Sequence, residues 1–163
     1  MKYEKKQFTL KDGSILSIRS AEKSDAESMK EYLRITAGET PFLLRNPDEV
    51  KLSLADEEIF IQNGLADPSS LILLGFIDGH HVGNASFSPI GRFRRYQHRC
   101  DIGIALYQKY AGKGVGRILL SELLQKAAET GYEQAELSVV AANTKAIHLY
   151  KSLGFQEYGK LQN

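Results

Sequence analysis

The chain has 163 residues, 42% of them hydrophobic and 25% charged, which are the proportions of a soluble globular protein and predict a single domain over residues 1–163. The net charge of +1 gives no electrostatic reason to expect a nucleic acid or a membrane as partner. One cysteine excludes an intramolecular disulfide and a multi-cysteine metal site. With no signal peptide and no apolar run of about 20 residues, we expect a cytoplasmic protein.

Two short strands are predicted at residues 8–10 and 15–19, because Asp12-Gly13 between them is a strong hairpin signal. A helix should follow, with Ser24 or Asp25 as its cap. Its apolar stripe repeats at helical spacing through Ala26, Met29, Tyr32 and Leu33.

Residues 36–47 contain a glycine and two prolines and are expected to be irregular. A second helix is predicted to open at Pro47, with acidic residues in its first turn, and to end near Gly64. The apolar residues assigned to this helix are Val50, Leu54, Ile59 and Phe60.

The middle of the chain predicts three strands. Residues 71–77 are an apolar run typical of a central strand, and residues 82–87 form its partner after a turn. Residues 98–106 alternate, with Cys100 and Ile102 on one face and Asp101 on the other. A glycine inside this third strand, Gly103, indicates a bulge or a close backbone approach.

The last part of the chain alternates helices and strands. Helices are predicted at 115–129 and at 144–153, the second capped by Asn143, and strands at 135–140 and 155–161. The whole order of elements indicates a mixed α/β sheet.

Three alternate glycines, Gly112, Gly114 and Gly116, stand between the strand at 98–106 and the helix that follows. Their backbone N–H groups are uncovered by side chains, and a helix N-terminus adds unpaired donors and partial positive charge. This loop suits a phosphate or pyrophosphate. It is not a Walker loop, because Gly114 stands where Ser or Thr is needed, and it fails the GxGxxG dinucleotide pattern.

Residues 111–116, Ala-Gly-Lys-Gly-Val-Gly, resemble the acyl-CoA loop of the Gcn5-related N-acetyltransferase (GNAT) family, whose pattern is Arg/Gln-x-x-Gly-x-Gly/Ala. Residues 143–155 are similar to a second family motif, Asn-x-x-Ala-x-x-Leu-Tyr-x-x-x-Gly-Phe. The resemblance covers about residues 98–161. It implies a mixed, mostly antiparallel sheet flanked by helices, with a splayed central strand pair. The chain departs from the pattern at Ala111, where the family usually has Arg or Gln.

The resemblance also implies acetyl-CoA as cosubstrate. Its pyrophosphate would lie on the backbone of Gly112 to Arg117, with charge added by Lys113 or Arg117, and its pantetheine would pair with the preceding strand. The cofactor-binding residues implied in this way are Ile104, Ala105, Leu106, Ala111, Gly112, Lys113, Gly114, Val115, Gly116, Arg117 and Asn143.

Asn143 and Tyr150 are seven residues apart, so they lie on one helix face, separated by about 10 Å along the axis. This spacing lets Asn143 hold the pantetheine while the phenol of Tyr150 protonates the leaving thiolate as a general acid. The alternative is that Asn143 is only an N-cap and Tyr150 only a core residue.

A base must remove a proton from the attacking amine. Asp101 is the first candidate, with a surface carboxylate at a strand end as the alternative. Glu39 is a candidate to hold or deprotonate the acceptor, unless it is only a loop charge, and His98 is a further option. The basic and aromatic run at residues 92–99 is more simply a solvated loop than a surface for an acidic partner. No metal site is expected, because the adjacent histidines at positions 80 and 81 point apart.

These residues and the resemblance predict a single-domain N-acetyltransferase in which a primary amine of a small molecule or peptide attacks acetyl-CoA directly. The alternative is a CoA-binding module without turnover. No nucleic acid and no membrane are expected as partners. The family usually adds one more strand after the one predicted here at 155–161, so we expect a truncated chain or an open sheet edge that a second copy would cover in a homodimer.

Overall fold

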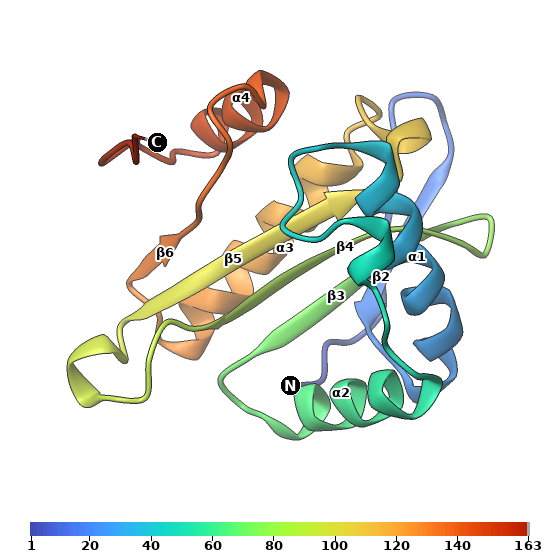
Figure 1. Cartoon of the computed structure of the whole chain (residues 1–163), viewed down its shortest axis with the longest axis horizontal. Coiled ribbons are helices and arrows are strands. Elements are labelled where there is room, and N and C mark those ends of the chain that lie inside the picture. Colours follow the sequence, from blue (N-terminus) through green and yellow to red (C-terminus); the bar gives the residue numbers. More distant parts are fainter. Residues whose placement is uncertain (163) are drawn as a thin grey trace.

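The structure of the protein is a computed structural model, and residues 1–162 are described. Within these residues the strands form one six-stranded sheet in the order β1-β2-β3-β4-β5-β6, the same order as along the chain (Figure 1). Neighbouring strands are antiparallel, except that β6 is parallel to β5. The strands are β1 (Lys6–Thr9), β2 (Ile15–Ser20), β3 (Leu71–Ile77), β4 (His80–Pro89), β5 (Arg99–Leu106) and β6 (Gln134–Glu136). The helices are α1 (Ala26–Glu39), α2 (Leu54–Ala66), α3 (Val115–Thr130) and α4 (Thr144–Ser152).

Two Asp-Gly pairs make the tight turns of the sheet, as the sequence predicts. Gly13 joins β1 to β2 with φ +85°. Asp78 and Gly79 join β3 to β4 with φ of +50° and +76°, the left-handed backbone that a two-residue hairpin turn uses. Each turn pairs two consecutive strands, β1 with β2 and β3 with β4. The long connection that carries α1 and α2 joins these two hairpins.

The two faces of the sheet are covered by different helices. On one face α3 buries Leu119, Leu120 and Leu123 against the sheet, in a cluster that also contains Ile18 and Phe87. On the other face α1 and α2 pack over Leu74 and its neighbours, through residues that include Met29 and Ile61. Because α1 and α2 gather over β2 and β3, the polar residues that β4 and β5 carry on this second face remain partly exposed (Figure 1).

Two helix predictions in the N-terminal half are wrong in extent. The first helix continues to Glu39 instead of becoming irregular at Thr36, whose hydroxyl donates to the Tyr32 carbonyl one turn earlier. The second helix does not open at Pro47, which instead begins a separate 3-10 turn.

Helix α2 begins at Leu54, where the side chain of Ser53 accepts the Asp56 N–H as an N-cap. The assignment of its apolar face is also wrong. Ile59 and Phe60 are exposed, while Glu57 and Ile61 are buried. A capping box at Ser53 therefore overrides the proline signal several residues earlier.

Three strand predictions differ from the structure. β6 ends at Glu136 instead of residue 140, and residues 155–161 form no strand. The parallel pairing of β5 with β6 stops at Asp101 and Glu136, after which the chain leaves the sheet toward α4 (Figure 1). Gly103 causes no bulge, because the β4–β5 register is continuous; the Ser86 hydroxyl lies 3.3 Å from where a Cβ would stand. β5 and β6 are therefore the splayed strand pair that the resemblance implies.

Candidate active site

The loop before α3 presents a run of unpaired backbone donors. Gly112 and Gly114 have φ of +78° and +89° and turn the chain into the helix. Among residues 1–162, no hydrogen-bond acceptor is found for the N–H groups of residues 112–117, and the first paired amide is that of Ile118, which donates to the Gly114 carbonyl over 3.2 Å. Six free N–H groups at the positive end of a 16-residue helix form a candidate anion-binding site, and residues 112–117 are called the anion-binding loop below.

The side chains of this loop add little to that site. Ala111 contributes no polar group, and its own N–H donates to the Gln108 carbonyl. The Lys113 ammonium lies 3.8 Å from the Asp12 carboxylate and is half exposed. Arg117 donates to the Ser152 hydroxyl over 2.7 Å, which links α3 to α4. The loop therefore relies mainly on its backbone.

Gly116 has a different role from the other two glycines of the loop. It lies within α3, and a Cβ there would stand 3.2 Å from Leu149 of α4 and 3.4 Å from Leu106 of β5. Leu106 lies closer still to β4, since a Cβ on Gly83 would stand 2.2 Å from its Cδ2. Gly83 and Gly116 thus leave the space that the Leu106 side chain fills, at the end of β5 next to the anion-binding loop.

The free edge of β5 lies between this loop and the short pairing with β6. At the two ends of the β4–β5 ladder, Tyr107 N–H donates to the Val82 carbonyl and Ile90 N–H donates to the Arg99 carbonyl. Hydrogen-bonded and non-hydrogen-bonded pairs alternate in an antiparallel ladder. With this register, the amides of Ile104 and Leu106 point away from β4, beyond the pairing with β6, which ends at Asp101 and Glu136.

Ala105 points the other way. Its backbone faces Asn84 of β4, and its carbonyl also accepts the Tyr32 hydroxyl of α1 at 2.8 Å. Of the three strand residues expected to pair with pantetheine, Ile104 and Leu106 therefore present free backbone groups at the open edge, and Ala105 does not.

Asn143 and Tyr150 both lie on α4, next to the anion-binding loop. The Asn143 side chain accepts the Ala146 N–H at 3.3 Å, so it caps the helix. Tyr150 packs edge-on against Phe155, with ring centroids 5.8 Å apart, and burial raises the pKa of its phenol. Within the described residues no hydrogen bond of its hydroxyl is found, and its ring is partly buried beside the core.

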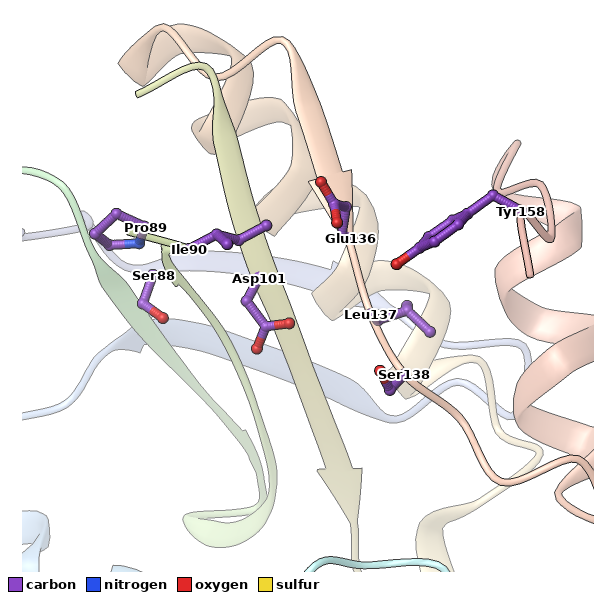
Figure 2. A pocket seen from close by; sticks show the side chains of 8 residues that line it. All are labelled: Ser88, Pro89, Ile90, Asp101, Glu136, Leu137, Ser138 and Tyr158. Carbon is purple, nitrogen blue, oxygen red and sulfur yellow. The ribbon is translucent and has the colours of Figure 1, made fainter. Parts of the chain in front are cut away.

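Asp101 lies in a pocket of about 390 Å³ at the point where β5 and β6 begin to separate (Figure 2). Figure 2 shows its carboxylate between side chains of β4 and side chains of β6 and the C-terminal segment. Burial, with the nearby negative charge of Glu136, raises the pKa of the Asp101 carboxyl. The residues that line the pocket are Ser88, Pro89, Ile90, Asp101, Glu136, Leu137, Ser138 and Tyr158.

The other candidate bases lie elsewhere. Glu39 stands at the end of α1, where its carboxylate accepts the Gln108 N–H at 2.8 Å, just after β5. It is not among the residues that line the Asp101 pocket. His98 precedes β5, and its carbonyl accepts the N–H groups of Glu133 and Gln134 before β6.

Sequence reasoning missed two residues of this region. Glu136 faces Asp101 across the β5–β6 pair and forms an ion pair with Arg99. Tyr32 reaches β5 from α1. The strands and the helix that carry these residues are predicted. The register between β5 and β6, which α3 separates in the chain, has no local sequence signal. The same is true of the contact between α1 and β5.

Two features are absent from residues 1–162. In this part of the chain no helix combines the length and the apolar character needed to cross a membrane. The same residues contain no cluster of three or more His, Cys, Asp or Glu side chains with the geometry to hold a metal ion.

The glycine loop, the splayed β5–β6 pair and the flanking helices form the α/β arrangement that the resemblance to the acetyltransferases implies. The sequence matches the family model described as "Acetyltransferase (GNAT) family" over residues 30–155, which is most of the chain. The chain therefore belongs to this family, and the resemblance predicted from residues 111–116 and 143–155 is confirmed.

Curated relatives match parts of the chain. It is 31% identical to the L-amino acid N-acyltransferase MnaT of Escherichia coli over 52% of this chain and 49% of that protein. It is 26% identical to the L-methionine sulfoximine/L-methionine sulfone acetyltransferase of Salmonella typhimurium over 86% of this chain and 80% of that protein. The first alignment thus spans about half of the relative's length.

Solved structures share the fold over most of its length. An acetyltransferase of the GNAT family from Streptococcus pneumoniae superposes with a TM-score of 0.84 at 29% identity, covering 88% of this chain and 86% of that one. The putative acetyltransferase yncA from Salmonella typhimurium, solved with its cofactor acetyl-CoA, superposes with a TM-score of 0.78 at 23% identity, covering 88% and 81%. These likenesses confirm the predicted fold class.

Proposed function

We propose that this protein transfers an acetyl group from acetyl-CoA to a primary amine by direct attack of the amine on the thioester. The observation that carries the proposal is the continuity of the donor groups. Six free N–H groups at residues 112–117 are followed, along the same face of the fold, by the free amides of Leu106 and Ile104. A pyrophosphate joined to an amide-bearing pantetheine chain has this sequence of acceptors.

On the donor side, the backbone of Gly112 to Arg117 binds the pyrophosphate, and Lys113 approaches the phosphates as a cation. Ile104 and Leu106 pair with the pantetheine amides, and the N–H groups of this edge polarise the thioester carbonyl as an oxyanion site does. Asn143 begins α4 and orients it toward the pantetheine. The loop binds without the polar side chain that the family usually has at Ala111.

The proton transfers are assigned to two side chains. Asp101, directly or through a water molecule, accepts the proton that the attacking amine loses as its nitrogen bonds to the carbonyl carbon. When the carbon–sulfur bond breaks, the Tyr150 phenol gives its proton to the leaving thiolate. The products are the N-acetylated amine and CoA with a free thiol, and both side chains recover their starting state by exchange with solvent.

The acceptor is a small molecule or a peptide with a primary amine, in the pocket around Asp101. Support for small acceptors comes from the relatives, whose names describe acyl transfer to L-amino acids and to methionine sulfoximine. The pocket of about 390 Å³ is large enough for an acceptor of that size.

The test is a measurement of CoA thiol release with acetyl-CoA and a panel of amines that includes L-amino acids, their amides and short peptides. Release that depends on one class of amine supports the proposal, and mass spectrometry should find that amine heavier by one acetyl group. If CoA raises the melting temperature but no amine yields thiol, the chain is a CoA-binding module without turnover. Stabilisation by ATP and not by CoA would overturn both readings.

Three wider expectations accompany this proposal. The chain acts as one domain, over residues 1–163. A cytoplasmic location fits the single buried thiol of Cys100, which needs no oxidising compartment. A homodimer is suggested by β6, which ends the sheet with one unpaired side. Limited proteolysis would test the single domain, cell fractionation the location, and sedimentation the homodimer.

A further inference from the structure

Helix α1 is tied to the end of β5 at two points. The Tyr32 hydroxyl donates to the Ala105 carbonyl at 2.8 Å, and the Glu39 carboxylate accepts the Gln108 N–H at 2.8 Å. Tyr32 and Glu39 are seven residues apart, so they lie on one face of α1, two turns from each other. Both hydrogen bonds therefore hold the same short stretch of chain, residues 105–108.

The Tyr32 side chain is held firmly. It is 3% exposed, and its ring lies 4.9 Å from that of His81 and 5.6 Å from that of Tyr107, measured between centroids. Burial raises the pKa of its phenol, so the hydroxyl stays protonated as a donor over the whole range in which proteins are stable. Because the ring is packed on both sides and the hydroxyl stays protonated, its hydrogen bond holds the Ala105 carbonyl in one orientation.

The bond to Ala105 acts on the next residue through the peptide plane. The Ala105 carbonyl and the Leu106 N–H belong to one planar unit and point in opposite directions. When Tyr32 and Asn84 hold the carbonyl on the β4 side, the Leu106 N–H is directed to the free edge of β5. The Leu106 side chain is held on the α3 face of the sheet, in the space left by Gly83 and Gly116.

We propose that Tyr32 and Glu39 are positioning residues that hold the acetyl-CoA-binding edge of β5 in place, acting through the peptide between Ala105 and Leu106 and not by contact with the cosubstrate. The inference rests on the proposed function. It assigns to α1, which carries no residue of the anion-binding loop, a share in the affinity for acetyl-CoA.

The test compares two Tyr→Phe variants. Tyr32→Phe removes the bond to Ala105. Tyr132→Phe removes a matched bond, because the Tyr132 hydroxyl donates to the Ser69 carbonyl at 2.7 Å, far along the chain from β5. We expect Tyr32→Phe to raise the Kd of CoA in calorimetry, and the KM for acetyl-CoA, by roughly fivefold, the worth of one neutral hydrogen bond. The KM for the amine and kcat should stay near wild type, and Tyr132→Phe should change none of these constants.

Glu39→Ala supplies a second, exposed position in case Tyr32→Phe is poorly folded. Positioning predicts a weaker effect in the same direction, on the KM for acetyl-CoA. If Glu39 instead holds the acceptor, as its sequence position alone allows, the KM for the amine rises and that for acetyl-CoA does not.

Equal CoA affinity in Tyr32→Phe and Tyr132→Phe would overturn the inference, as would a Glu39→Ala effect confined to the amine. Failure of the proposed function looks different, because the wild-type protein itself would then release no CoA thiol with any amine or would bind no CoA.

Discussion

At the scale of single residues, the two groups assigned to proton transfer lie in different surroundings. Asp101 is a carboxylate in an open pocket whose pKa is raised by burial and by Glu136. Tyr150 is a phenol with a raised pKa, packed beside Phe155 on α4. An amine reaction needs a base that is deprotonated and an acid that is protonated at the same pH. The raised pKa makes Asp101 a stronger proton acceptor than a free carboxylate, and the raised pKa of Tyr150 favours its protonated form.

The pH dependence of the reaction should report on Glu136. The base works only when deprotonated, so kcat/KM falls as the pH drops through the pKa of Asp101. Glu136→Gln removes a nearby negative charge and releases Arg99 from its ion pair. Both changes lower the pKa of Asp101, so we expect the acid limb of the profile to move to lower pH. Glu133→Gln, on the turn before β6, should leave the limb in place, and an unmoved limb in Glu136→Gln would remove Asp101 from the role of base.

Tyr150→Phe tests the acid. The variant keeps the ring and its contact with Phe155 but cannot protonate the thiolate. We expect kcat to fall by about 100-fold, the usual worth of a general acid, with the Kd of acetyl-CoA changed little. Tyr96→Phe, in the loop before β5, is the control. Unchanged turnover in Tyr150→Phe would assign the proton to solvent.

At the scale of the elements, local signals predict local structure. The Asp-Gly turns, the glycine loop and the Asn143 cap are each specified within a few residues, and the structure has all three. The end of α1, the short β6 and the missing strand at 155–161 depend on partners distant in the sequence. The same holds in the site. The loop and Asp101 are predictable, whereas the pairing of Asp101 with Glu136 depends on a register that only the fold defines.

The contact between β4 and β5 should be sensitive to one methyl group. A Cβ on Gly83 would stand 2.2 Å from Leu106 Cδ2 and 2.8 Å from the Ala105 carbonyl oxygen, so the β5 backbone must move. We expect Gly83→Ala to lower the free energy of unfolding by about 2 kcal/mol, as overpacking does, and to weaken CoA binding at Leu106. Chemical denaturation and calorimetry measure the two effects. Gly64→Ala, in α2 with ordinary packing space, should not weaken CoA binding.

At the scale of the whole molecule, the fold separates the two proposed substrate sites. The anion-binding loop and α4 lie at the end of β5 that carries Leu106, and the Asp101 pocket lies at its other end, beyond the cover of α1 and α2. The β5 strand is the element common to both. The position of β5 therefore sets the distance between the proposed acetyl-CoA site and the proposed amine site.

One buried carboxyl group lowers the stability of the whole fold at neutral pH. Glu57 on α2 is 2% exposed, and among the described residues its Oε1 has no hydrogen-bond partner. Burial raises the pKa of Glu57, against the opposing effects of Arg45 and Lys30. Because the folded pKa exceeds the unfolded one, the penalty is absent below the unfolded pKa and complete above the folded pKa.

We therefore expect Glu57→Gln to raise the free energy of unfolding by about 1 kcal/mol at pH 7, and the gain to disappear near pH 4. Urea titrations at the two pH values measure it. The exposed neighbour Glu58, paired with Lys23, should give no such gain when changed to Gln. A Glu57→Gln gain that is equal at both pH values would show that the effect does not come from ionisation.

The identity of strand order and chain order has a consequence for synthesis. Each strand from β2 to β5 joins a neighbour that has already left the ribosome, so the antiparallel sheet can grow from one side without waiting for distant segments. The glycine loop, α3, β6 and α4 emerge afterwards. We expect the nascent chain to possess its acceptor face, except for the residues that β6 and the C-terminal segment add, before it acquires any affinity for CoA.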